Sequence, residues 1–197
     1  MAGVLDPAGI AISTLSGSQE YPAVAFDGTN YLVAWKDNRN AGIFDIYGSR
    51  VSTSGSVVDP LGILISNATD EQTEVSLAFD GTNYFVVWQD DRDFVTSSRN
   101  IYGCRINQNG NVLDASGIAI STASDTQQFG AVAFGSTNYF VVWQDRRNYA
   151  TSKWDIYGSR VGTDGSIIDA SGILMSSSAN EQWYSASAFD GTNYLVV

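Results

Sequence analysis

The sequence predicts an all-β fold: a β-propeller of four-stranded antiparallel blades, with three complete blades and a partial one. The pentapeptide Asp-Gly-Thr-Asn-Tyr at 27–31 returns at 80–84 and 190–194, and as Gly-Ser-Thr-Asn-Tyr at 135–139. Each copy holds about four short apolar segments separated by turns, and no segment has helical periodicity with caps. A repeat at this period indicates one supersecondary unit that packs against its own copies.

The first two strands of each copy are predicted from an apolar run, a turn and an aromatic run. The apolar run at 23–26 has counterparts that end at Phe79, Phe134 and Phe189. The Asp-Gly turn follows it, with glycine where a tight hairpin needs a positive φ. The second strand, at 31–35, 84–88 and 139–143, has aromatic and β-branched residues on both faces. This pattern indicates a strand that is buried from both sides.

The last two strands are more polar. The third, at 45–51, 100–106 and 155–161, alternates as a strand nearer solvent does, and the fourth, at 62–66, 117–121 and 172–176, has polar flanks. A propeller blade needs this gradient, since its first strand lines the axis and its fourth faces water. A β-solenoid is the alternative repeat fold, but its coils are usually shorter and lack hairpin turns.

The copies divide the chain into one repeat domain, 1–197. We expect an outer strand of a shared blade at 1–13, blades at 19–66, 72–121 and 127–176, and a partial blade at 182–197. The shared blade would hold first, second and fourth strands but no third, so the chain is either truncated or completed by another molecule. Because open edges and blade faces associate, we expect a homo-oligomer, most simply a dimer that completes a seven- or eight-bladed ring.

Composition excludes several classes of partner and chemistry. The chain has 10 Lys+Arg against 21 Asp+Glu, a net charge of −11, which disfavours nucleic acid and anionic membranes. No apolar run approaches the roughly 20 residues of a membrane helix, and no signal peptide opens the chain. The single cysteine, Cys104, excludes an intrachain disulfide, and the lack of histidine removes the commonest general base and zinc ligand. We expect no cofactor and no metal.

The blocks DGTNYLVAW at 27–35 and DIYGSRV at 45–51 resemble repeats of large secreted bacterial proteins. Those repeats are taken to form β-propeller-like domains beside adhesion or sorting modules. The resemblance covers practically the whole chain and implies an extracellular or cell-surface parent protein and a non-catalytic propeller. The Asp-Gly turn also resembles the Asp-box of sialidase-like propellers, but the residue order differs, so no active site is carried over.

Loops that vary between copies are expected to gather on one face. They lie at 40–44, 93–99 and 148–154 after the second strand, and at 14–20, 67–71, 122–127 and 177–182 before the first. A rigid scaffold with one variable face is typical of a binding protein. The candidate ligand contacts are one acid and seven aromatic residues suited to stacking on sugars: Tyr21, Phe44, Glu74, Phe94, Phe129, Tyr149, Trp154 and Tyr184. Alternatively, the aromatic residues only cover the blade tops.

Polar residues that recur in every complete copy are interpreted as structural. A Trp-x-Asp-x-Arg motif ends each second strand, and a glutamine stands seven residues before each phenylalanine. The motif could form a ring of charges around a polar ligand, but a catalytic group is needed once rather than three times, so a blade-stabilising network is favoured. Its members are Asp37, Arg39, Asp90, Arg92, Asp145, Arg147, Gln19, Gln72, Gln127 and Gln182.

Three functions remain open from the sequence. The leading interpretation is a non-enzymatic extracellular recognition or adhesion propeller, with a glycan as its candidate ligand. The alternatives are a fragment of a carboxylate-dependent glycoside hydrolase or lyase, and a structural spacer on a cell surface. Glu74 and Asp91 are the acids that best break the repeat, and we expect them to be solvated. If both were buried, close together and facing the axis, they would favour the enzyme, since glycosidases use a pair of acids about 5–10 Å apart.

Overall fold

The computed structural model describes residues 6–40, 42–178 and 180–197 of the chain, and almost all of its regular structure is antiparallel sheet. The first sheet holds β1 (Gln19–Phe26), β2 (Asn30–Asp37), β3 (Asp45–Ser52) and β4 (Ile63–Ser66). The second holds β5 (Gln72–Phe79), β6 (Asn83–Asp90), β7 (Asn100–Asn107) and β8 (Ile118–Ser121). The third holds β9 (Gln127–Gly135), β10 (Asn138–Asp145), β11 (Asp155–Gly162) and β12 (Ile173–Ser176). A two-stranded sheet, β13 (Ser187–Phe189) and β14 (Tyr194–Val196), follows.

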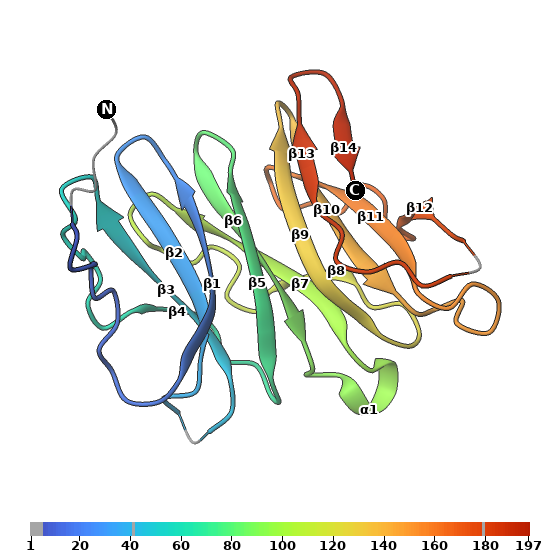
Figure 1. Ribbon diagram of the computed structural model, residues 1–197, viewed down its shortest axis with the longest axis horizontal. Coiled ribbons are helices and arrows are strands. Elements are labelled where there is room, and N and C mark those ends of the chain that lie inside the picture. The colour runs from blue at the N-terminus through green and yellow to red at the C-terminus, as the bar shows by residue number, and fades with distance from the viewer. Residues whose placement is uncertain (1–5, 41, 179) are drawn as a thin grey trace.

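The sheets are blades that share one axis. Within each complete sheet the strands are hydrogen-bonded in chain order, and β1, β5, β9 and β13 lie next to one another in turn (Figure 1). The first strand of every blade therefore lines the inner side of the arc. This arrangement confirms the predicted all-β propeller with three complete blades and a partial one.

The recurring pentapeptide makes the hairpin between the first two strands. Gly28, Gly81 and Gly191 have φ values of 96°, 96° and 102°, which L side chains rarely adopt. In the third blade Ser136 takes a comparable role with φ of 57°, so the turn survives the loss of glycine there. The preceding Asp27 accepts backbone N–H bonds from Thr29 and Asn30, which closes the turn.

The core lies between successive blades, on the second strands. Tyr84, Trp88, Tyr139 and Trp143 have no exposed surface, as their aromatic run predicted, whereas Tyr31 of the first blade is 41% exposed. The difference arises because no blade covers that side of β2 among the described residues. The tyrosines also tie the blades by hydrogen bonds to backbone carbonyls: Tyr84 Oη to Asn30 at 2.9 Å, Tyr139 Oη to Asn83 at 3.0 Å and Tyr194 Oη to Asn138 at 2.6 Å.

Two features differ from the sequence-based expectation. A single-turn helix, α1 (Phe94–Ser97), lies in the loop after β6 and is the one helix of the described residues, too short to cross a membrane. The outer strand expected at 1–13 is not formed over residues 6–13, and residues 1–5 lie outside the described part. Ile10 nevertheless contacts the Gly55 turn as Ile63 contacts the Gly110 turn, so this segment occupies a fourth-strand position. Within 6–40, 42–178 and 180–197, no third strand pairs with this segment.

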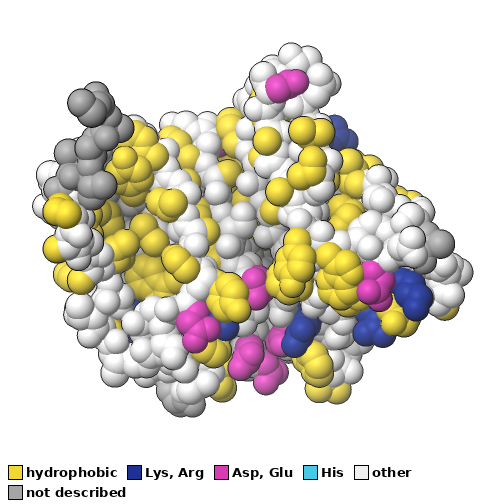
Figure 2. All heavy atoms as spheres, in the orientation of Figure 1, with side chains coloured by type: hydrophobic (Ala, Val, Ile, Leu, Met, Phe, Trp, Pro, Cys, Tyr) yellow, Lys and Arg dark blue, Asp and Glu magenta, His cyan; other side chains and the backbone are white. Residues whose placement is uncertain are grey.

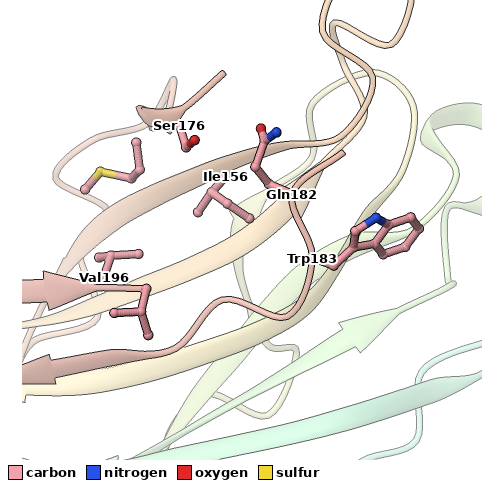
Figure 3. A pocket seen from close by; sticks show the side chains of 7 residues that line it. Ile156, Ser176, Gln182, Trp183 and Val196 are labelled. Atoms are coloured by element: carbon pink, nitrogen blue, oxygen red, sulfur yellow. The ribbon is translucent and has the colours of Figure 1, made fainter. Parts of the chain in front are cut away.

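The open face of the third blade leaves apolar side chains in solvent. Met175 is 41% exposed although its counterpart Ile120 in the second blade is 3% exposed. A cavity of about 450 Å³ opens beside it, lined by Ile156, Ser176, Gln182, Trp183 and Val196, among others (Figure 3). This surface is the half of a blade interface that has no partner among the described residues.

Self-association of the chain stays a prediction, now with a specific surface. Burial of the exposed Met175, Leu195 and Val197 against a second copy would remove apolar area from water, so we expect a dimer at micromolar concentration. Sedimentation or light scattering measures the mass, and Leu195→Lys should shift the equilibrium toward monomer. A monodisperse monomer of the unmodified chain would refute the dimer.

Candidate functional site

The Trp-x-Asp-x-Arg motif forms the same buried network in each complete blade. In the second blade Asp90, with no exposed surface, accepts bonds from Trp88 Nε1 at 2.7 Å and from Arg92 Nε and Nη2 at 2.8 and 2.7 Å. Arg92 donates to the Ser116 carbonyl and stacks on the Tyr102 ring at 4.0 Å. Asp37 with Arg39 and Asp145 with Arg147 repeat this geometry. The oxygens of these carboxylates accept their hydrogen bonds from residues of the same blade. The network therefore stabilises the loops of its own blade.

The repeated glutamines close the loops that enter the first strands. Gln72 Nε2 donates to the Asp70 carbonyl at 2.8 Å, and Gln127 Nε2 donates to the Asp125 carbonyl at 3.0 Å. Gln19 makes the same bond to Gly17, and Gln182 makes it to Asn180. Each bond joins the glutamine side chain to the backbone carbonyl two residues earlier. It therefore fixes the backbone just before the position, two residues after the glutamine, that differs between copies.

A β-bulge then turns one side chain per blade toward the inner face. The register of β1, β5 and β9 shifts opposite Trp35, Trp88 and Trp143. At this bulge the three complete blades place Tyr21, Glu74 and Phe129 with a left-handed backbone, φ 52–55°, which is rare outside glycine. Tyr184 has the same backbone, φ 56°, in the irregular segment before β13. Such strained positions concentrate at functional sites. We call these four residues the bulge row.

Glu74 is the one acid in the bulge row. It is half-buried, and it shares a cavity of about 150 Å³ with Phe129 and Tyr184. Burial raises the pKa of Glu74, although the positive charges of Lys36 and Arg99 lower it in part. The carboxyl group of Glu74 therefore lies beside aromatic rings and near the charges of two cations.

Asp91 lies close to the same cation. Arg99 Nε is 3.5 Å from Asp91 Oδ2, and the Asp91 side chain is 13% exposed. Burial raises the pKa of Asp91, Arg99 lowers it, and the nearby Glu71 raises it. Asp91 and Arg99 line a second cavity of about 290 Å³ with Phe94. The prediction that Glu74 and Asp91 are solvated is therefore wrong, since both are partly buried, and they line two different cavities.

Backbone bonds between blades hold the surrounding loops in a fixed order. Gln72 N donates to the Phe44 carbonyl, Gln127 N to the Arg99 carbonyl and Gln182 N to the Trp154 carbonyl, at 2.8, 2.8 and 3.2 Å. Each bond places a loop residue of one blade beside the bulge residue of the next. Charged and aromatic side chains accordingly gather along the lower part of the inner face in Figure 2.

The predicted contact residues fall into three groups. Phe129 and Tyr184 form a tilted ring pair at 4.9 Å beside Glu74. Tyr21 and Phe44 hold Lys36 between their rings, 4.7 and 4.1 Å from the ammonium nitrogen.

The third group is not brought to Glu74. Phe94 lies on α1, and Tyr149 packs under Arg146. Trp154 was expected at the exposed loop face but is only 8% exposed, because it packs on Trp183 at 5.5 Å.

Sequence reasoning missed three residues of this site. Lys36 stands where the other complete blades have Gln89 and Gln144. Arg99 stands where they have phenylalanine and tryptophan, and Trp183 replaces a glutamate, a threonine and a glutamine. The sequence did contain a signal for these residues, since each of the three differs from its counterparts in the other copies of the repeat.

The described part of the chain shows no grouping of three His, Cys, Asp or Glu residues that could hold a metal ion. Cys104 is fully buried, and burial raises the pKa of its thiol.

Comparison with known proteins supports the fold. No protein family model and no curated protein match the chain. Among solved structures, a thermostable family-43 glycoside hydrolase is 11% identical with a TM-score of 0.61 over 90% of this chain and 64% of its own. An endo-arabinase from Bacteroides thetaiotaomicron VPI-5482 is 14% identical, with a TM-score of 0.61 over 93% of this chain and 71% of its own. A neuraminidase-like protein from A/bat/Guatemala/164/2009 is 13% identical, with a TM-score of 0.60 over 92% and 54%.

These comparisons correct the functional expectation. The chain spans less than two thirds of the length of the family-43 glycoside hydrolase, and at these identities the likeness concerns the fold. Similar structures that are glycoside hydrolases nevertheless contradict the leading interpretation, a non-enzymatic recognition or adhesion propeller, and the expectation that the chain is not an enzyme. The lack of histidine misled that interpretation, because glycosidases work with carboxyl groups.

Proposed function

We propose that the chain is part of a carboxylate-dependent glycoside hydrolase in which Glu74 donates the proton to the leaving group. The observation that carries this proposal is the bulge row, where one blade has a half-buried acid and the other three have aromatic residues. A hydrolase is favoured over a lyase because one of the structures with this fold is a glycoside hydrolase by name.

Each of the two acids has a proposed role. Burial raises the pKa of Glu74, which favours its protonated form, and this proton would pass to the glycosidic oxygen as the carbon–oxygen bond breaks. Asp91, which lines the cavity next to Arg99, is the candidate for the second carboxylate. Burial raises the pKa of Asp91 as well, but the charge of Arg99 favours its ionised form, which would take a proton from the attacking water. Lys36 and Arg99 would then stabilise the carboxylate left on Glu74.

We further propose that the enzyme acts outside the cell. The supporting feature is the resemblance of its repeats to those of secreted bacterial proteins.

The pH dependence of hydrolysis tests the role of Glu74. Arabino-oligosaccharides are the first substrates to use, since an endo-arabinase shares the fold, followed by a panel of neutral aryl glycosides. We expect kcat to fall on the alkaline side as Glu74 loses its proton, at a higher pH than for an ordinary glutamate because its pKa is raised. No hydrolysis of any glycan, or a kcat without an alkaline limb, would refute the proposal.

A further inference from the structure

The side of the site toward the partial blade carries a continuous aromatic surface. Phe129 and Tyr184 form a ring pair at 4.9 Å, and both line the cavity that contains Glu74. Trp183 follows at 6.4 Å from Tyr184, and Trp154 supports it from below at 5.5 Å. Tyr184 is 71% exposed and Trp183 is 45% exposed, whereas Phe129 is partly buried, so the surface is most open toward the partial blade. Trp183 also lines the cavity beside Met175. We call Phe129, Tyr184 and Trp183 the aromatic track.

The opposite side of Glu74 offers no such surface. There Tyr21 and Phe44 both contact Lys36, which also pairs with Glu20 at 3.1 Å. Their rings are therefore occupied by a cation. The site is asymmetric, with stacking surface on one side of the acid only.

The charges around the track disfavour an acidic ligand. Four of the ten basic residues lie outside the repeated blade networks: Lys36, Arg99, Arg146 and Lys153. Three of these four pair with carboxylates, at distances of 3.1, 3.5 and 4.0 Å. Additional acids on the same loops are exposed, among them Glu71 and Glu181. A polyanion would meet an excess of negative charge.

We propose that the aromatic track binds consecutive rings of a neutral glycan chain, so that the substrate is a linear, uncharged oligo- or polysaccharide held mainly on the partial-blade side of Glu74. This proposal rests on the proposed hydrolase for the role of Glu74, but the track binds sugar by itself. Sugar rings have apolar faces that pack on aromatic rings, and rigid aromatic residues dominate such contacts. Three rings in a row predict that affinity grows with chain length.

The experiment measures binding separately from hydrolysis. The full chain carrying Glu74→Gln is titrated by calorimetry with xylo-, cello- and arabino-oligosaccharides of one to six units, and with oligogalacturonides of the same lengths. We expect affinity for a neutral series to rise with each unit up to three or four, and the acidic series to bind at least about tenfold more weakly. Tyr184→Ala should weaken binding of the longer neutral chains about tenfold. Tyr149→Ala is the matched control, an exposed aromatic residue that packs under Arg146, and should have no effect.

The outcomes separate this proposal from the hydrolase. Binding that depends on chain length and on Tyr184, in a chain that hydrolyses nothing, would keep the track and refute the hydrolase. If the chain hydrolyses glycans and neither Tyr184→Ala nor Trp183→Ala changes the KM, the proposed hydrolase stands and the proposed role of the aromatic track is overturned. Equal affinity for single sugars and long chains, or for acidic and neutral chains, also overturns it.

Discussion

Glu74→Gln is expected to lower kcat for glycosides with poor leaving groups by a factor of about 10²–10⁴, the usual contribution of a general acid. Glutamine has nearly the same shape and can still donate a hydrogen bond from its amide, but it cannot transfer a proton. The fold should be retained, because Glu74 is half-buried in a cavity and makes no hydrogen bond within the blade network. The measurement is steady-state hydrolysis at the optimum pH of the unmodified chain.

Leaving-group dependence distinguishes a proton donor from a residue that only shapes the site. With a dinitrophenyl leaving group, which departs without protonation, the same variant should keep most of its kcat. Glu181→Gln, which changes an exposed acid in the corresponding loop of the partial blade, serves as the matched control and should not alter either rate. An equal loss on both substrate classes would mean that Glu74 is not the proton donor.

Asp90→Ala is expected to destabilise the chain by about 3–5 kcal/mol, as loss of one partner from a buried ion pair usually does. Asp90 has no exposed surface and accepts bonds from Trp88 and Arg92, so its removal leaves an indole N–H and a guanidinium unsatisfied in the blade. Domains of this size have a total stability of about 5–15 kcal/mol, so the loss is a large part of the whole. Denaturant unfolding followed by tryptophan fluorescence measures it.

The control for this variant is another aspartate with local bonds. Asp164→Ala changes an exposed turn residue that bonds only to Ser166, and its unfolding midpoint should stay close to that of the unmodified chain. If Asp90→Ala cost less than about 1 kcal/mol, the network would behave as a surface salt bridge and would not brace the blade.

The repeat made the scaffold predictable and left the site partly hidden. Strand positions followed from apolar runs such as 31–35 and 84–88. A propeller repeats the same local pattern in every blade, so each copy of the pattern can be checked against the others. The partial burial of Glu74 and Asp91 did not follow, because it depends on how segments distant in the sequence pack around them. Distances between loops of different blades are set by packing and cannot be obtained from spacing along one chain.

The exposed aromatic residues were predicted with mixed success for the same reason. Phe129 and Tyr184 occupy equivalent positions in consecutive blades, so their proximity follows from the repeat itself. Trp154 was expected to be exposed, yet Trp183 covers it, and that contact joins residues without equivalent positions. Positions that depart from the repeat were the best guide to the site. A comparison of the copies would have identified Lys36, Arg99 and Trp183.

The bulge row also bears on how such a site could arise. Its left-handed backbone is present with tyrosine, glutamate and phenylalanine alike, so the strain belongs to the blade and is independent of the side chain. A duplicated blade would therefore present a ready position on the inner face, where a single codon change alters chemistry without disturbing folding. Genes built from this unit could acquire, lose or relocate an acid among blades in one mutational step, while the remaining copies keep the architecture intact.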